Sequence, residues 1–286
     1  MSLRARVLAL AAVVLVLSSA RAVSPPPAPL ATAFGHGPAI VLVPGLGSSA
    51  AHWMPTARLL SRHHRVVFVE LPGHGASAMP EPFSLERAAE ALDRALARET
   101  HEPVVLVGHS LGGLVAAAEA CDRPGRVRAL VLVETALRPQ VSGPERPAAL
   151  AALDRDYAGT LSQAYADFGR DSAQGATLGR EAAALDPAVV KPWIRLAFTA
   201  DLSARVARLR CPVLAVFAPR SWPKGEPWVE AAAALGYGSV PRVRASRVDD
   251  CGHFVMLDRP DELARLISRF ADAPDGDPVV FDFGRR

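Results

Sequence analysis

A serine and a histidine, each placed just after an apolar run, are the side chains of this sequence best suited to chemistry. Residues 104–113 read V-V-L-V-G-H-S-L-G-G, so Ser110 follows a short apolar segment. Such a segment, bounded by Pro103 and Gly108, is typical of a buried parallel strand, and the residues after Ser110 favour a helix. His253 lies in C-G-H-F, after another predicted strand. An imidazole that accepts the proton of a serine hydroxyl makes the serine a nucleophile.

The glycines around Ser110 indicate the kind of turn on which it lies. A sharp turn from strand to helix strains its central residue and brings neighbouring chain very close, which Gly108, Gly112 and Gly113 would permit. The Ser110 hydroxyl would then be exposed at a helix start, and the amide of Leu111 could donate to a developing oxyanion. The strand before and the helix after are the context that a nucleophile elbow requires. The alternative is a glycine-rich turn that carries an idle serine.

A second glycine-rich loop follows the predicted strand at residues 39–43. It reads P-G-L-G-S-S, and in open α/β sheets such a loop at the carboxyl end of a strand borders the site. We predict that the amide of Leu46 is the second oxyanion donor. A plain tight turn is the alternative. In the later turn L-P-G-H-G-A-S, we interpret His74 as a structural hydrogen-bonding residue.

The first 22 residues have the pattern of a secretory signal peptide. Arg4 and Arg6 precede an apolar run, and small residues lead to a predicted cleavage after Ala22. We therefore expect a secreted or periplasmic protein that leaves the membrane on cleavage, with an uncleaved membrane tether as the alternative. Removing this segment lowers the formal charge from +3 to zero, because it contains three arginines and no acid. No basic run interleaved with aromatics remains, so we expect a small-molecule substrate and no nucleic acid.

The remaining chain divides by composition and pattern. We predict a proline-rich linker with a short strand at 23–36, a core domain at 37–134 and 211–272, a helical lid at 135–210, and a polar tail at 273–286. Helices are expected in the lid at 147–168, at 180–185, and with breaks at 187–209. Its aromatic residues favour packing over substrate contact; they are Tyr157, Tyr165, Phe168, Trp193 and Phe198.

The cysteines imply neither a metal centre nor a disulfide framework. The sequence has an odd number of cysteines and no C-x-x-C spacing, although one bridge could form after export; the cysteines are Cys121, Cys211 and Cys251. We expect no metal and no organic cofactor.

Strands that alternate with helices predict an α/β fold with a mostly parallel sheet covered on both faces. With P-G-L-G-S-S, L-P-G-H-G-A-S, G-H-S-L-G-G and C-G-H-F in this order, residues 37–270 resemble the α/β-hydrolase superfamily. The resemblance implies Ser110 as nucleophile, His253 as general base and then general acid, and the Leu46 and Leu111 amides as the oxyanion hole. It implies a serine hydrolase that cleaves a small ester, thioester or lactone through an acyl-enzyme.

The carboxylate that would complete a catalytic triad with Ser110 and His253 does not follow the family's pattern. A strand of the type P-V-L-x-V-x-G is usually followed within a few residues by an aspartate that orients the histidine, whereas here F-A-P-R-S-W follows. Glu134, at the end of the strand after Ser110, is our preferred acid, and Glu226 is the alternative. Asp249 and Asp250 are too close in sequence to His253. Because losing this carboxylate can cost about 10⁴ in turnover, a ligand-binding protein with little activity is a rival hypothesis. Carbon–carbon bond hydrolysis and acyl transfer also remain open.

Overall fold

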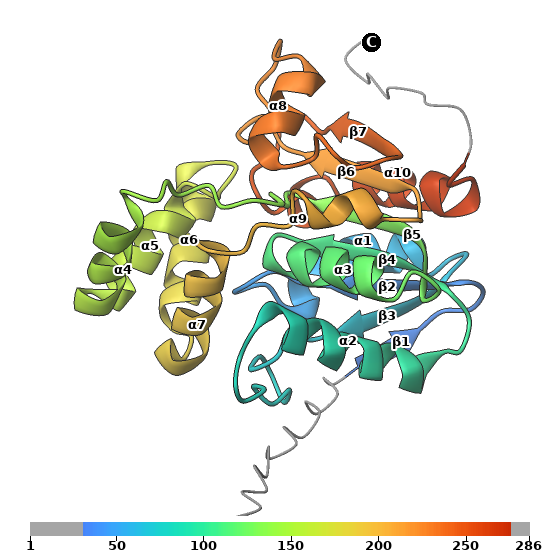
Figure 1. Ribbon diagram of the computed structural model, residues 1–286, viewed down its shortest axis with the longest axis horizontal. Helices are drawn as coiled ribbons and strands as arrows, with labels where there is room; N and C mark the ends of the chain where they lie inside the picture. Colours follow the sequence, from blue (N-terminus) through green and yellow to red (C-terminus); the bar gives the residue numbers. More distant parts are fainter. Residues whose placement is uncertain (1–30, 276–286) are drawn as a thin grey trace, which may run out of the picture.

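The computed structural model describes residues 31–275 (Figure 1). The predicted signal segment at 1–22, most of the predicted linker and nearly all of the predicted tail therefore lie outside the described residues. Within the described range, no helix combines the length and the apolar character needed to cross a bilayer.

Seven strands form one sheet in the order β1-β3-β2-β4-β5-β6-β7. Only β1 is antiparallel, and it pairs with β3 at one edge of the sheet. The other pairs are parallel, as predicted from the continuous apolar runs, whose residues are buried on both faces of the central strands. The strands are β1 (Ala31–Phe34), β2 (Ala39–Val43), β3 (Arg65–Val69), β4 (Val104–His109), β5 (Val127–Val133), β6 (Val213–Phe217) and β7 (Val243–Arg247).

Helices cover both faces of the sheet. Helices α2 and α3 pack together on one face, and α1 and α10 on the other (Figure 1). Because α3 packs against β4 and β5 and also against α2, all its residues except the last are buried. The fold-class prediction is confirmed. The core helices are α1 (Ala50–Leu60), α2 (Leu85–Glu99), α3 (Leu111–Asp122), α8 (Trp228–Leu235), α9 (Val255–Asp258) and α10 (Pro260–Asp272).

Four further helices and a 3-10 turn separate β5 from β6. They are α4 (Arg146–Arg155), α5 (Tyr157–Ala166), α6 (Ser172–Ala183), α7 (Pro187–Ala197) and η1 (Arg205–Arg208). The helices project beyond one end of the strands, at the left of Figure 1. They lie beyond the carboxyl ends of the parallel strands, where the loops after β2, β4 and β5 emerge (Figure 1).

Two of the expected boundaries in this helical insertion are wrong. The expected helix at 147–168 is divided, because the Asp156 side chain accepts a hydrogen bond from Gly159 N and begins α5. The expected helix at 180–185 begins earlier, at Ser172, since Asp171 caps it. Gly175 and Gly179 weaken the helical pattern of the sequence, but they let α6 approach α5 closely.

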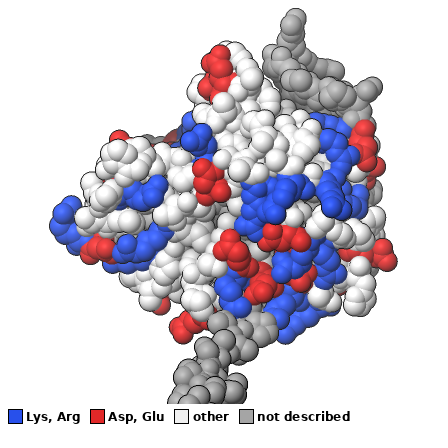
Figure 2. All heavy atoms as spheres, viewed as in Figure 1, with Lys and Arg blue, Asp and Glu red and all other residues white. Residues whose placement is uncertain are grey.

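Charged side chains of both signs are mixed on the face that carries α2 and α3 (Figure 2). Many of them form ion pairs, such as Arg126–Asp93 at 3.1 Å and Arg87–Glu90 at 2.9 Å. The surface on this side therefore shows no uniform charge.

Candidate active site

The turn between β4 and α3 holds Ser110 in a strained conformation. Its φ is +51° and its ψ is −122°, and its amide donates to Val133 O at 3.0 Å. The surrounding glycines are required by close packing. A Cβ on Gly108 would lie 2.5 Å from the Cα of Gly113, and one on Gly112 would overlap the carbonyl of Pro44. Ser110 is partly exposed at the top of the sheet, as expected for a residue that reacts with substrate.

The loops after β2 and β4 place two free amides beside Ser110. Among residues 31–275, neither Leu46 N nor Leu111 N donates to a protein acceptor. Leu46 is held through its carbonyl, which accepts the Tyr165 hydroxyl at 2.7 Å. Gly47 has a φ of +71°, and any Cβ there would crowd the Tyr165 ring. A residue of the helical insertion thus fixes the loop that offers the amide of Leu46.

His253 is held by its backbone from two sides. Its amide donates to Phe168 O at 2.8 Å, and its carbonyl accepts His109 Nε2–H at 2.9 Å. The Phe168 ring packs against the imidazole, with 4.4 Å between the centroids. Burial lowers the pKa of His109 well below its usual value, so His109 is a neutral donor. Neither Phe168 nor His109 was identified from the sequence as a support for His253.

Glu134 lies next to His253, and its side chain is fully buried. Its Oε2 is 2.9 Å from His253 Nδ1, and its Oε1 accepts the Ala218 amide at 2.7 Å. The Ser221 hydroxyl also donates to Oε2 at 2.9 Å, and Arg220 Nη1 is 3.4 Å away. The loop after β6, where the family usually carries its acid, therefore supplies donors to an acid that follows β5. These donors were missed, because nothing in F-A-P-R-S-W points to them.

The other carboxylates considered from the sequence have different partners. Asp249 pairs with Arg247 at 3.4 Å, and Asp250 with Arg259 at 3.4 Å. Within the described chain, the Glu226 side chain makes no hydrogen bond or ion pair with His253. Of the carboxylates weighed from the sequence, Glu134 alone among residues 31–275 contacts the imidazole.

Two cavities meet at Ser110. One, of about 370 Å³, is lined by Glu134 and His253 together with Arg138, Gln140 and Arg220. The other, of about 280 Å³, is almost entirely apolar. Its wall includes Leu46 and residues of the helical insertion: Leu153, Leu161, Tyr165 and Ile194. Phe168 and Phe198 border both cavities, so these two aromatic residues of the insertion face the site, whereas we expected packing to be their main role.

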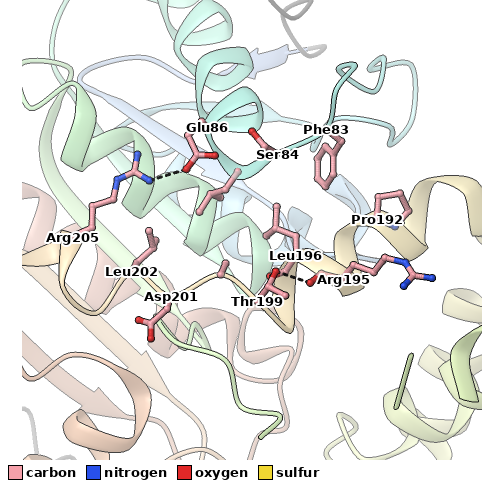
Figure 3. Close-up of a pocket in the computed structure, with 12 residues that line it drawn as sticks. Phe83, Ser84, Glu86, Pro192, Arg195, Leu196, Thr199, Asp201, Leu202 and Arg205 are labelled. Atoms are coloured by element: carbon pink, nitrogen blue, oxygen red, sulfur yellow. Dashed lines mark hydrogen bonds and ion pairs between the residues drawn. The ribbon is translucent and has the colours of Figure 1, made fainter. Parts of the chain in front are cut away.

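A third cavity, of about 570 Å³, lies between the start of α2 and the end of α7 (Figure 3). Its charged groups have partners in the protein: Arg205 pairs with Glu86 at 3.2 Å, and Arg195 with Asp154 at 2.8 Å. None of the predicted site residues lines it. His74, whose Nδ1 is 3.3 Å from Pro72 O, also lies outside the cavities at Ser110. Residues 31–275 contain no group of three or more metal-ligating side chains.

Known proteins resemble this chain over most of its length. A model of the alpha/beta hydrolase family matches residues 40–266. A pimeloyl-[acyl-carrier protein] methyl ester esterase of Xanthomonas campestris pv. campestris is 31% identical over 256 residues, which covers 84% of this chain and 97% of the esterase. Polyketide synthase ThaQ of Burkholderia thailandensis is 31% identical over 252 residues. That match covers 83% of this chain but spans 12% of the synthase.

Solved structures show the same fold. The enol-lactonase of Burkholderia xenovorans LB400 has a TM-score of 0.70 and 21% identity, and the match covers 84% of this chain and 95% of the lactonase. A hydrolase from Oleispira antarctica has a TM-score of 0.72 and 17% identity, covering 85% and 94% of the two chains. At these identities the likeness concerns the fold.

Proposed function

Because the chain belongs to the alpha/beta hydrolase family, we propose that it is a serine hydrolase that cleaves a small ester, thioester or lactone through an acyl-enzyme intermediate. The proposal rests on one arrangement: a strained Ser110 in a cavity that also contains His253, whose Nδ1 is 2.9 Å from Glu134. The esterase matched over 84% of this chain supports the reaction class.

In the proposed mechanism, Glu134 accepts a hydrogen bond from Nδ1–H of His253, which holds the tautomer in which Nε2 is the base. Nε2 takes the Ser110 proton while Oγ attacks the substrate carbonyl, and the amides of Leu46 and Leu111 stabilise the oxyanion. The imidazolium then gives its proton to the leaving group, and the acyl-enzyme forms. Water attacks this ester with His253 as base, which releases the acid and restores Ser110.

We assign helices α4–α7 the role of a lid. Tyr165 and Phe168 support this role, because they contact the Leu46 loop and the His253 loop respectively. A lid that excludes bulk water strengthens the electrostatic contacts of the site. How much water it admits would also decide between hydrolysis and acyl transfer to an alcohol. Carbon–carbon bond hydrolysis would use the same Ser110, His253 and Glu134.

The rival hypothesis of a ligand-binding protein without turnover rested on the missing acid after β6. The contact between Glu134 and His253 removes that reason.

The enzymatic proposal is tested with a series of chromogenic esters. Ser110→Ala should lower kcat by about 10⁶, because it removes the nucleophile. Ser142→Ala is the matched control, since this serine is exposed and its hydroxyl bonds only to Glu145 of the same turn. Retained ester hydrolysis in Ser110→Ala, with full activity in the control, would overturn the assignment of the nucleophile.

We also propose that residues 1–22 direct export and are removed, so that the mature protein acts in the periplasm or outside the cell. The basic start of this segment, its apolar run and the small residues before Val23 support its export and removal. N-terminal sequencing of the protein from the periplasm or medium should find Val23 first. Ala22→Phe should block this cleavage. An intact Met1 on wild-type protein in the membrane fraction would instead support a permanent tether.

A further inference from the structure

Ser110 separates an apolar cavity from a cavity whose wall carries two arginines. The apolar cavity of about 280 Å³ is bordered by Leu46, whose amide is a proposed oxyanion donor, and by residues of the lid helices. The other, of about 370 Å³, contains His253 and the side chains of Arg138, Gln140 and Arg220. An ester bound at Ser110 would place one of its two parts in each cavity.

The position of His253 decides which part lies where. In the proposed reaction, the imidazole must pass its proton to the leaving-group oxygen, so the leaving group must lie on the His253 side. The acyl chain then occupies the cavity that lacks His253. At about 30 Å³ for a group the size of a water molecule, that cavity holds roughly nine methylene-sized groups. An apolar acyl chain of medium length fits it.

Arg220 offers donors to the leaving-group cavity. Its side chain is about one-third exposed, and its guanidinium lies over the Phe168 ring, 4.8 Å from the centroid. Its two hydrogen bonds, to Glu134 and to Ser221, both come from Nη1 at 3.4 Å. In the described part of the chain, Nη2 and Nε have no acceptor. The contact with Glu134 is also the longest of the four that this carboxylate receives.

Arg138 brings a second positive charge to the same wall. It is exposed at the cavity and forms no ion pair with any carboxylate of residues 31–275. Asp201 accepts the Ser203 amide at 2.9 Å and makes no ion pair with Arg138, although the Ser203 hydroxyl and amide and, less strongly, the Arg138 charge lower the pKa of Asp201. Two guanidiniums therefore face a single carboxylate, Glu134, in the lining of this cavity. An excess of one positive charge suits one substrate carboxylate, which a planar guanidinium can bind with two parallel hydrogen bonds.

We propose that Arg138 and Arg220 make the enzyme selective for esters whose leaving group carries a carboxylate, that is, apolar acyl esters of hydroxy acids. Hydrolysis of such an ester gives the fatty acid and the free hydroxy acid, with water as the only co-reactant. This selectivity rests on the proposed hydrolase function and adds the substrate class to it.

A matched pair of substrates tests the selectivity: 4-(octanoyloxy)benzoate and the neutral 4-(octanoyloxy)benzamide. The release of each phenol is followed by absorbance, and the ratio of the two kcat/KM values is the readout. Intrinsic differences between the two leaving groups cancel when ratios are compared between variants. A charge-assisted contact predicts that Arg138→Gln lowers the wild-type ratio about ten- to hundredfold. Arg138→Glu should lower it further by repelling the carboxylate, and Arg138→Lys should restore part of it.

Arg195→Gln is the matched control, because Arg195 lies on α7 at the cavity of Figure 3 and pairs with Asp154. It should leave the ratio at the wild-type value. The selectivity proposal is overturned if both substrates are hydrolysed and the ratio is the same in wild type, Arg138→Gln and Arg138→Glu. Failure of the hydrolase proposal itself looks different, since neither substrate would then be cleaved by any form of the protein.

Discussion

Glu134 and Glu119 both have fully buried side chains, and they differ in the number of donors around them. Glu134, after β5, accepts the Ala218 amide on one oxygen, and on the other the Ser221 hydroxyl and the His253 ring nitrogen. Glu119, on α3, receives Arg123 on one oxygen at 2.8 Å, and its other oxygen has no partner among the described residues. Burial raises the pKa of Glu119 to about 8, against the opposing effect of Arg123.

Burial alone therefore does not make a carboxylate fit to orient a histidine. A buried carboxylate that lacks donors keeps its proton up to a higher pH, whereas one surrounded by N–H and O–H groups can serve as a fixed acceptor. The loop after β6 provides these groups to Glu134. Glu119→Gln can therefore serve as the control for Glu134→Gln, because each substitution replaces a buried carboxylate by an amide of the same size.

The largest expected effect comes from Glu134→Gln. A side-chain amide can donate to Nδ1 instead of accepting from Nδ1–H, so the imidazole adopts the wrong tautomer and kcat should fall by about 10⁴. Initial rates on a chromogenic ester measure this. Glu119→Gln, far from the nucleophile, should keep the wild-type rate. Equal rates in Glu134→Gln and wild type would show that another group orients His253.

The orienting carboxylate can also be moved from position 134 to the loop after β6, where the family usually carries it. Glu134→Gly removes the carboxylate and suits the φ of +48° at this position. Adding Ser221→Asp to Glu134→Gly should raise kcat about tenfold over Glu134→Gly, as a partial recovery of the roughly 10⁴ lost with the acid. Ser221→Asn in the same background is the control, since it has the shape but not the charge. A gain with Asn as large as with Asp would count against a carboxylate at this site.

A smaller effect is expected from the donor that supports Glu134. Ser221→Ala removes a hydrogen bond to Oε2, and a loss of about 1 kcal/mol predicts a roughly fivefold lower kcat. KM should stay near the wild-type value, because Ser221 acts through Glu134 and not on substrate. Ser221→Thr should restore kcat by restoring the hydroxyl. A change confined to KM would assign Ser221 a different role.

The smallest effect on activity, and a distinct effect on stability, is expected at Glu119. Its pKa of about 8 in the fold exceeds the ordinary value of 4.5, so the folded state binds the extra proton between these pH values. The stability from this group is complete below about pH 4.5 and is lost as the pH rises to about 8, by at most about 1.4 kcal/mol per pH unit. Glu119→Gln should lack this loss. Urea unfolding of both proteins from pH 5 to pH 9 tests it, and parallel curves would contradict the raised pKa.

The elements around Ser110 could be predicted because the sequence carries a local signal for them. Gly108 permits a close contact with Gly113 within the turn, and the apolar run before Ser110 is typical of a buried strand. Gly112 and Gly113 face Pro44 and Thr135 of neighbouring loops, but as glycines beside Ser110 they indicated a crowded turn. The amides of Leu46 and Leu111 follow from those turns. The α/β fold followed from the alternation of strands and helices, and the family model and the solved structures agree with it.

What could not be predicted depends on chain that meets only in the folded protein. Sequence favoured Glu134 because of its strand end, but the Ala218 and Ser221 donors lie more than 80 residues away. Phe168 was assigned to packing, although its carbonyl holds His253. Helices α5 and α6 begin after the N-caps Asp156 and Asp171. The alanine-rich sequence around these caps is compatible with helix on either side of them, so it did not indicate where each helix begins.

Covalent labelling with a serine-directed fluorophosphonate, followed by peptide mass spectrometry, tests directly whether Ser110 is an activated nucleophile. We expect one adduct, on Ser110, absent in Ser110→Ala and formed far more slowly in Glu134→Gln than in Glu119→Gln. No adduct on wild-type Ser110, or equal labelling rates in the two Glu→Gln variants, would contradict this expectation.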